Sequence, residues 1–265
     1  MTMSRVEGPG TVAPPREIRR LGRGSFAAGV VLCLLGIAVL VGLGTWQMER
    51  LGWKNGLIAT IEARVHAPPR PLEEVEAEFA RGGDVDYVPV LVSGRFLHAD
   101  ERHVLSTSGG AAGWNVFTPL RLDDGRTLFV NRGFVAYDRK SAETRSGGQV
   151  EGAVAFAGIA RNALAEKPSS FVPDNDPVKN AFFWKHLPDL ARGLPEADMA
   201  GLLPFIVDAG PDTPSGAGGP VGGTTVVDIP NSHLQYAITW YGLAAVLSVM
   251  LVLLVLRQRR APRDG

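Results

Sequence analysis

The sequence contains almost no cysteine and no surplus of charge of either sign, and each shortage excludes a class of protein. Its 265 residues include one cysteine, Cys33, so neither a disulfide framework nor a thioredoxin-like or thiolate-copper site is expected. The 27 basic and 27 acidic side chains balance, so nothing indicates nucleic acid as a partner. Motifs of serine nucleophiles, zinc proteases and carboxylate pairs are missing too. The sequence therefore gives no sign of an enzyme.

Two long uncharged runs are the most informative features that are present. Ser25 to Trp46 and Tyr236 to Leu256 each reach the roughly 20 residues that a helix needs to cross a bilayer. A cleavable signal peptide is the alternative for the first run, but its apolar part is normally about 7–15 residues long and ends at small residues. Because the first run is longer and ends in a tryptophan, we expect an uncleaved transmembrane helix.

Basic residues flank both runs on the side of the chain ends. They are Arg16, Arg19, Arg20 and Arg23 before the first run, and Arg257, Arg259, Arg260 and Arg263 after the second. Positive flanks stay in the cytoplasm, so both termini are expected there. The expected organisation is a cytoplasmic tail (1–24), a transmembrane helix (25–46), an extracytoplasmic domain (47–235), a second transmembrane helix (236–256) and a basic tail (257–265). In a bacterium, this is a multi-pass inner-membrane protein with a periplasmic domain.

The middle of the chain combines a helical extension with short strands. Helical spacing continues from Gln47 to about Arg64, prolines end it, and Leu72 to Arg81 is expected to be a short acidic helix. From Tyr87 onward the apolar period changes to two. Strands are expected at 87–96, 104–106, 115–122, 127–136, 152–161, 182–185, 205–208 and 224–229. This pattern predicts an α+β membrane protein, in which two helices flank a mostly antiparallel β barrel or sandwich.

Aromatic and cationic residues gather at the outer ends of the two predicted membrane helices. On each helix they recur about one turn apart and so share a face. They are Trp46, Arg50, Trp53 and Lys54 on the first helix, and His233, Tyr236 and Trp240 on the second. One interpretation is an aromatic belt with snorkelling cations. The other is a groove for a flat anionic macrocycle, with stacking tryptophans, cation–carboxylate pairs and His233 as an axial ligand of iron.

Several motifs resemble, in order, those of the surfeit-locus family of cytochrome c oxidase assembly factors. They are Leu43 to Gln47 with Arg50, Trp53 and Lys54 after it, Val130 to Val135, Phe171 to Pro177, Gly219 to Gly223, and Asn231 to Leu243. The resemblance runs from about residue 40 to 245 and includes the layout of two helices.

The resemblance implies an assembly factor that assists the insertion of haem a into the catalytic subunit of cytochrome c oxidase, without catalytic turnover. The expected protein partners are this catalytic subunit and haem a synthase, and the two apolar runs add the lipid bilayer. Haem a would be a transient cofactor, and the histidine that matches the family's closing motif is His233. The alternative is a cofactor-free membrane scaffold that docks the nascent oxidase subunit.

A second group of motif residues is predicted to be structural. It comprises Asn131, Arg132, Gly133, Pro173 and Asn175. Gly133 is expected to permit a bulge or a close backbone approach, and Arg132 to pair with Asp174 or Asp176. Direct contact with a partner is the alternative for these residues.

Overall fold

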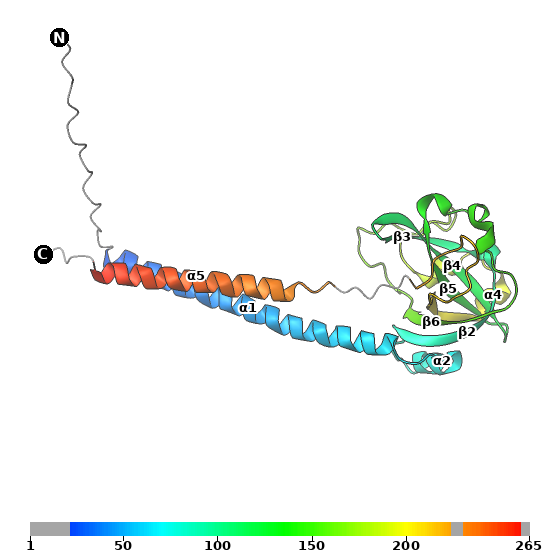
Figure 1. The fold of residues 1–265 in the computed structure, drawn as a ribbon, viewed down its shortest axis with the longest axis horizontal. Coiled ribbons are helices and arrows are strands. Elements are labelled where there is room, and N and C mark those ends of the chain that lie inside the picture. The colour runs from blue at the N-terminus through cyan, green and yellow to red at the C-terminus, as the bar shows by residue number, and fades with distance from the viewer. Residues whose placement is uncertain (1–21, 224–229, 261–265) are drawn as a thin grey trace, which may run out of the picture. The chain divides into compact units, whose positions relative to one another are not determined.

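The computed structural model describes residues 22–223 and 230–260 and divides the chain into two compact units (Figure 1). One unit contains the chain up to Gly56 and from Pro230 onward, and the other contains Leu57–Ile229. The strand expected at 224–229 lies outside the described residues.

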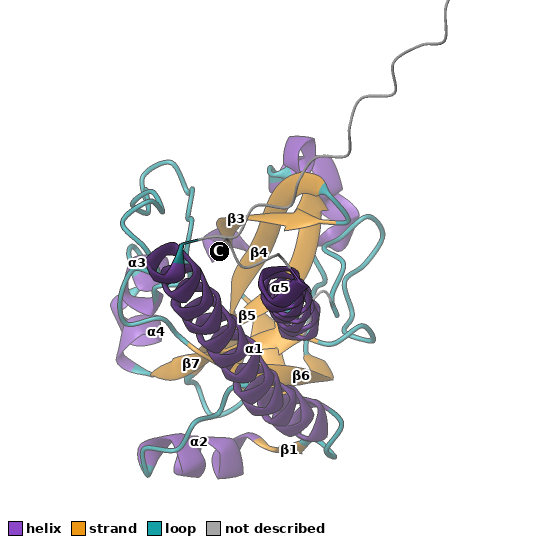
Figure 2. Cartoon of the chain, turned by 90° about the vertical axis from the view of Figure 1, so that its left-hand side faces the viewer, coloured by secondary structure: helices purple, strands orange, loops and turns teal. Residues whose placement is uncertain are grey.

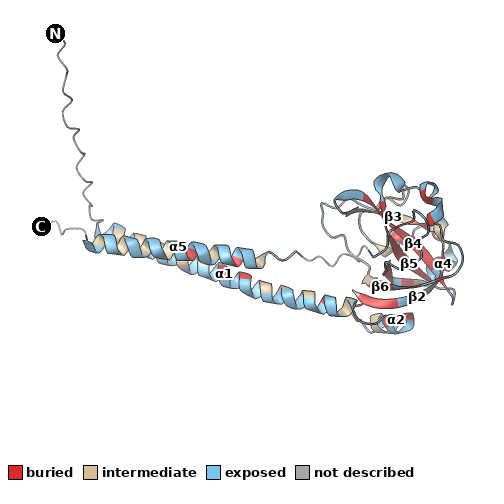
Figure 3. Cartoon of the chain, viewed as in Figure 1, coloured by how far each residue is buried: buried red, intermediate tan, exposed pale blue. Residues whose placement is uncertain are grey.

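Two long helices make up the first unit. They are α1 (Arg23–Val65), which continues into the second unit, and α5 (His233–Arg260). By length and composition, both are long and apolar enough to cross a membrane. Figure 3 shows that most of their residues are exposed, as expected for helices that face lipid. The spans expected at 25–46 and 236–256 lie within these helices.

The predicted extension of the first helix is confirmed, because α1 continues to Val65 as one helix of 43 residues. Prolines at 68 and 69 follow within one turn and cannot continue it. The acidic helix expected next is α2 (Leu72–Ala80), whose Leu72 and Val75 are buried.

The second unit is built around one seven-stranded sheet. Its other elements are β1 (Arg70–Pro71), β2 (Val88–Phe96), η1 (His98–Asp100), β3 (Arg102–Ser108), β4 (Ala111–Leu122), β5 (Thr127–Ala136), η2 (Tyr137–Arg139), η3 (Ala142–Gly148), β6 (Val154–Asn162), α3 (Leu187–Ala191), α4 (Glu196–Ala200) and β7 (Leu202–Ala209). The strand order is β1-β2-β6-β7-β5-β4-β3.

The expected antiparallel barrel or sandwich is only partly correct. The sheet is mixed, because β7 pairs parallel with β5 and β1 pairs parallel with β2. β2 also pairs with β4, but only from Gly94 to Phe96, while β1 and β3 remain as edges. The domain is therefore neither a sandwich nor a closed barrel. The long connection from β6 through α3 and α4 brings β7 back parallel to β5. Alternation of apolar residues along β7 predicts a strand but not its direction.

Most of the expected strands are confirmed, and one is wrong. The segment Phe182 to Lys185 forms only an isolated bridge, between Phe182 and Val104. Phe182 is fully buried, so its apolar neighbourhood belongs to the core rather than to a ladder. A short apolar run is compatible with both.

Hydrophobic side chains cover both faces of the sheet. Along β7, Phe205 and Val207 point into one core together with Val75 of α2, and Ile206 points into the other. The second core is completed by residues of the connection that carries α3, among them Leu190. Figure 2 shows the strands with α2, α3 and α4 around them.

Candidate functional site

His233, the first residue of α5, contacts α1 through a side-chain hydrogen bond. Its Nδ1 lies 2.7 Å from Oε1 of Gln47, which is buried between the helices. An amide oxygen only accepts, so Nδ1 carries the proton and donates. In this tautomer the lone pair lies on Nε2, for which the described part of the chain provides no hydrogen-bond partner.

Small residues bring the two helices together beyond this hydrogen bond. Ala237 and Ala244 of α5 are buried, and a Cβ at Gly44 would lie 2.7 Å from the ring of Tyr241. The hydroxyls of Tyr241 and Thr45 are 3.1 Å apart. Close approach at small residues, with polar groups paired across the interface, is typical of helix pairs in membranes.

Polar contacts continue between α1 and the segment that precedes α5. Lys54 Nζ donates to the carbonyl oxygen of Pro230, and Asn231 Nδ2 donates to Asn55 Oδ1 at 2.8 Å. Lys54 is therefore committed to the backbone that precedes α5.

The exposed aromatic residues of the predicted groove lie beside this interface. With about 100° per residue, Trp46, Arg50 and Trp53 lie about 60–120° around α1 from Gln47. Tyr236 lies about 60° around α5 from His233. Tyr241, which contacts Gly44 and Thr45, marks the opposite flank. The three α1 residues and Tyr236 of α5 therefore lie on the same flank of the antiparallel helix pair, and Tyr241 lies on the other flank. We call Trp46, Arg50, Trp53, Tyr236 and His233 the flank site.

Within the flank site, aromatic rings and one cation are available to a ligand. Trp46 and Trp53 are each 55% exposed, and Tyr236 is 53% exposed. The Arg50 guanidinium lies 3.9 Å from the centre of the Trp53 ring and has no ion-pair partner among the described residues. Trp240 is half-buried on the side of α5 that faces α1. This arrangement provides stacking surface, one nitrogen ligand and one free guanidinium.

Gln47 was not selected as a site residue from the sequence, although it belongs to a quoted motif. A signal existed: it is an uncharged polar residue directly after an apolar run, where membrane helices use such residues to contact one another. Without knowing which side of α1 faces α5, however, Gln47 cannot be told from its exposed neighbours.

The predicted role of Gly133 is confirmed. Its φ is +113°, and a Cβ there would lie 1.8 Å from the carbonyl oxygen of Val221. Phe134 and Val221 exchange backbone hydrogen bonds at this point. The β4–β5 register also shifts here, because Arg132 and Gly133 together oppose Val116 alone.

The predicted ion pairs of Arg132 are wrong. Its Nη2 donates to the carbonyl oxygen of Gly148 at 2.5 Å, and its guanidinium lies over the ring of Phe96. Asp174 and Asp176 pair with lysines instead. Burial is the main reason that the pKa of Arg132 falls to about 10, with Glu101 opposing the shift. The bulge turns Arg132 into the domain, away from the loop that carries the two aspartates.

Asn131 and Asn175 both organise backbone. Asn131 Oδ1 accepts from the Gly133 amide at 3.1 Å, while its Nδ2 donates to Asp208 at 2.9 Å. Asn175 Oδ1 accepts from the amide of Phe183 at 2.9 Å, and its Nδ2 donates to the carbonyl of Trp184 at 3.2 Å. Pro173 is exposed in the same loop.

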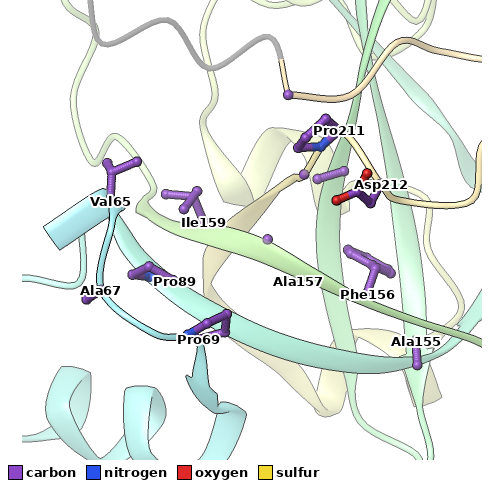
Figure 4. A pocket seen from close by; sticks show the side chains of 14 residues that line it. Val65, Ala67, Pro69, Pro89, Ala155, Phe156, Ala157, Ile159, Pro211 and Asp212 are labelled. Atoms are coloured by element: carbon purple, nitrogen blue, oxygen red, sulfur yellow. The ribbon is translucent and has the colours of Figure 1, made fainter. Parts of the chain in front are cut away.

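A separate cavity of about 480 Å³ lies where α1 ends in the domain (Figure 4). Its walls are almost entirely apolar or backbone, with Val65, Pro69, Ala157 and Ile159 among them, and Asp212 is its single charged side chain. Apart from Asp212, no side chain of this cavity can form an ion pair. No group of three His, Cys, Asp or Glu suited to a metal ion occurs within residues 22–223 and 230–260.

These features define a class of protein, namely a mixed β domain between two apolar helices that meet through a histidine–glutamine contact. The chain belongs to the SURF1 family, whose sequence model matches residues 34–245. It is 39% identical to Surfeit locus protein 1 of Mus musculus, over 80% of this chain and 71% of the mouse protein. It is 38% identical to Surfeit locus protein 1 of Homo sapiens (83% and 75% covered) and 37% identical to a SURF1-like protein of Monosiga brevicollis (89% and 91% covered).

Proposed function

We propose that this chain is a membrane-anchored assembly factor for cytochrome c oxidase that assists the insertion of haem a into the catalytic subunit, without catalytic turnover. Membership of the SURF1 family supports the class of function. The observation that carries the haem assignment is the His233–Gln47 hydrogen bond, because it occupies Nδ1 and leaves Nε2 without a hydrogen-bond partner among the described residues.

The flank site suits a ligand that must be released again. When bound, haem a would supply an iron centre, carboxylates and a long apolar tail. His233 would provide one axial nitrogen, Arg50 would pair with a carboxylate, and Trp46 and Trp53 would stack on the macrocycle. One nitrogen ligand and exposed partners hold a ligand less firmly than a buried pair of ligands. Such a site is suited to transfer rather than storage.

The proposed location follows from the apolar helices and their basic flanks. Both termini lie in the cytoplasm, and residues 47–235 lie in the periplasm, next to the oxidase subunit and haem a synthase as partners. A helix pair in the bilayer keeps the ligand within the phase in which its apolar tail is soluble.

A cofactor-free scaffold that docks the nascent oxidase subunit is the second candidate. It is supported by the loop around Asn175, in which Phe171 is 95% exposed and Val178 is 97% exposed. Apolar side chains that stand this far into solvent are available to a protein partner.

Purification of the full chain in detergent from cells that make haem a separates the candidates. The proposal expects a red preparation whose Soret band is lost in His233→Ala and retained in His66→Ala, where the exposed His66 serves as the control. A colourless wild-type preparation, or a Soret band unchanged in His233→Ala, contradicts haem binding at His233. In that case Phe171→Ser and Val178→Ser should lower oxidase levels if the scaffold candidate is correct.

A further inference from the structure

A second pocket, of about 350 Å³, lies within the β domain between the strands and the segment that follows β6. Four strands contribute polar side chains to it, and the segment after β6 contributes a lysine and two aromatic residues. These are Asn115 of β4, Asn131 of β5, Arg161 of β6 and Asp208 of β7, with Phe183, Trp184 and Lys185. We call this the Lys185 pocket.

Lys185 is the one cation of the pocket without a bonded partner. Its side chain is half-buried, and the described residues provide no hydrogen bond or ion pair for Nζ. Burial lowers the pKa of Lys185, and the nearby charge of Arg161 lowers it further, against the attraction of Asp208 and Asp86. The ammonium group is thus desolvated without a full counter-charge.

The acids near Lys185 are engaged elsewhere. Asp208 accepts from Asn131 at 2.9 Å and from Arg161 at 3.3 Å. Asp86 accepts from Arg161 at 3.2 Å and from the amide of Asn162 at 2.8 Å. Arg161 is thus held by two carboxylates and also lies over the ring of Tyr87. Lys185 remains as the free donor.

Further donor capacity lies on β4. The side-chain amide of Asn115 has no hydrogen-bond partner in the described part of the chain and also lines the pocket. Phe183, Trp184 and Leu164 supply apolar walls. The other polar side chains of the pocket are bonded to one another, so two unpaired donors beside apolar side chains remain for a small ligand.

Two sequence motifs build this pocket, although neither has a role at the flank site. The Gly133 amide donates to Oδ1 of Asn131 and so fixes that side chain, and Asn131 Nδ2 donates to Asp208. Asn175 fixes the backbone of Phe183 and Trp184, which precede Lys185 directly. The motif residues therefore set the shape and charge of the pocket.

We infer that the Lys185 pocket binds a carboxylate carried on an apolar body, with Lys185 and Asn115 as donors and Phe183 and Trp184 as walls. A carboxylate fits because it only accepts hydrogen bonds, and because it supplies the negative counter-charge for the ammonium group of Lys185. The inference is independent of haem binding, because every residue it uses lies in the unit formed by Leu57–Ile229.

The test is a titration of the full chain in detergent with 4-fluorophenylacetate, followed by fluorine NMR, with neutral 4-fluorophenylacetamide as the matched probe. The acid should bind at least tenfold more tightly than the amide. Equal dissociation constants for the two probes on the wild-type protein would overturn the inference, whatever any variant does.

Variants locate the binding. Lys185→Met should weaken binding of the acid at least tenfold, and Lys185→Arg should keep it within about threefold. Lys179→Met is the control, because Lys179 is 81% exposed and pairs with Asp176 in the same loop. Unchanged binding in a folded Lys185→Met protein, or an equal loss in Lys179→Met, would also overturn the assignment.

Two sources can supply such a carboxylate, an acidic side chain of a partner polypeptide or a free small acid. Acetyl-Phe-Glu-amide carries its only carboxylate on the side chain, and acetyl-Phe-Gln-amide is its neutral match. Tighter binding of the glutamate peptide than of 4-fluorophenylacetate assigns the pocket to a partner polypeptide, and the reverse order assigns it to a free acid. Both orders support carboxylate binding, whereas binding of the glutamine peptide as tight as that of the glutamate peptide contradicts it.

Discussion

Gly133 shows how one backbone position determines several side chains. Its positive φ and its contact with Val221 place the bulge, and the bulge directs Arg132 inward and Asn131 toward Asp208. A residue with a Cβ at this position would be strained by the positive φ. Its Cβ would also clash with the backbone of Val221, which cannot move aside as a flexible side chain can.

We expect Gly133→Ala to lower the free energy of unfolding by about 2–4 kcal/mol, because strain and clash add at this position. Urea unfolding of the full chain in detergent, followed by tryptophan fluorescence, measures it. Gly125→Ala is the matched control: its φ is +87° but the space around it is open, so it should cost only about 1 kcal/mol. Equal losses for the two variants would show that the contact with Val221 costs nothing.

A buried polar cluster beside Arg132 links stability to pH. Glu101 accepts from Arg145 and lies 3.1 Å from Nε2 of His103, and all three side chains are buried. Burial alone would raise the pKa of Glu101, but these hydrogen bonds outweigh it and lower the pKa. Burial lowers the pKa of His98, which donates to the Val150 carbonyl and accepts from Arg132.

Both shifts predict that acid destabilises the β domain. The folded-state pKa values lie below the ordinary 6.5 of histidine and 4.5 of glutamate. As the pH falls, the unfolded chain therefore binds more protons than the folded chain, and folding becomes less favourable. The stabilisation is complete above pH 6.5. It declines through the folded pKa of His98 and then, below 4.5, through that of Glu101. Urea midpoints measured from pH 7.5 to 3.5 should fall in these two ranges.

Two variants assign the ranges. His98→Gln should remove the decline that begins below pH 6.5, while the exposed His66→Gln should not. Glu101→Gln should cost about 3 kcal/mol at pH 7, because it leaves Arg145 buried without its charge partner. Midpoints independent of pH in the wild-type protein would mean that neither group differs in pKa between the folded and unfolded chain.

At the scale of elements, the α1–α5 pair depends on a narrow strip of small and polar residues. Ala237 and Ala244 allow the helices to approach, and the Gln47–His233 hydrogen bond is the polar contact nearest the start of α5. Since Gln47 Oε1 accepts from Nδ1, Gln47 both joins the helices and fixes the tautomer of His233.

If His233 binds haem iron as proposed, Gln47→Leu should weaken haem binding about tenfold, because the ring loses its orienting acceptor. Haem titration in detergent, followed by the Soret band, measures the dissociation constant. Gln235→Leu, on the exposed side of α5, is the control and should bind haem as the wild type does. Equal affinities of Gln47→Leu and wild type would show that the hydrogen bond only joins the helices.

Local pattern was enough to predict most elements but not their pairing. Period-two alternation placed β2 to β6 within a few residues, and proline chemistry placed the end of α1. The parallel partner of β7 depends on a connection of about forty residues, and alternation carries no information on direction. The strand predicted at 182–185 was wrong for a related reason. In a sequence, a short apolar run that packs into a core cannot be told from one that pairs in a sheet.

The sites divide in the same way. The spacing of Trp46, Arg50 and Trp53 predicted that they share a face of α1, because one helix determines that face. The partner of His233 depends on two helices separated by most of the chain. The Lys185 pocket needs four strands and a loop, so its residues show no common pattern in the sequence. Local rules place residues on a surface, and tertiary pairing decides which surfaces meet.

At the scale of the whole molecule, the chain separates its two proposed binding sites. The flank site belongs to the helical unit and the Lys185 pocket to the β unit. Loss of haem binding in a His233 variant therefore leaves the carboxylate test intact, and the reverse also holds. Net charge does not distinguish the sides of the membrane, because 27 basic and 27 acidic residues balance. Only the arginines beside the apolar helices carry information on orientation.

These arginines predict that the β domain and the C-terminus lie on opposite sides of the membrane. Cys33 is the only cysteine, so a Cys33→Ser chain can carry one reporter thiol at a time. A cysteine at the exposed Val178 should react in intact bacterial cells with a maleimide that cannot cross the inner membrane, and one at Ala261 should react only after permeabilisation. Equal labelling of both positions in intact cells would contradict a two-helix topology with a periplasmic domain. Labelling of Ala261→Cys alone would reverse the orientation, and would then place the Lys185 pocket in the cytoplasm.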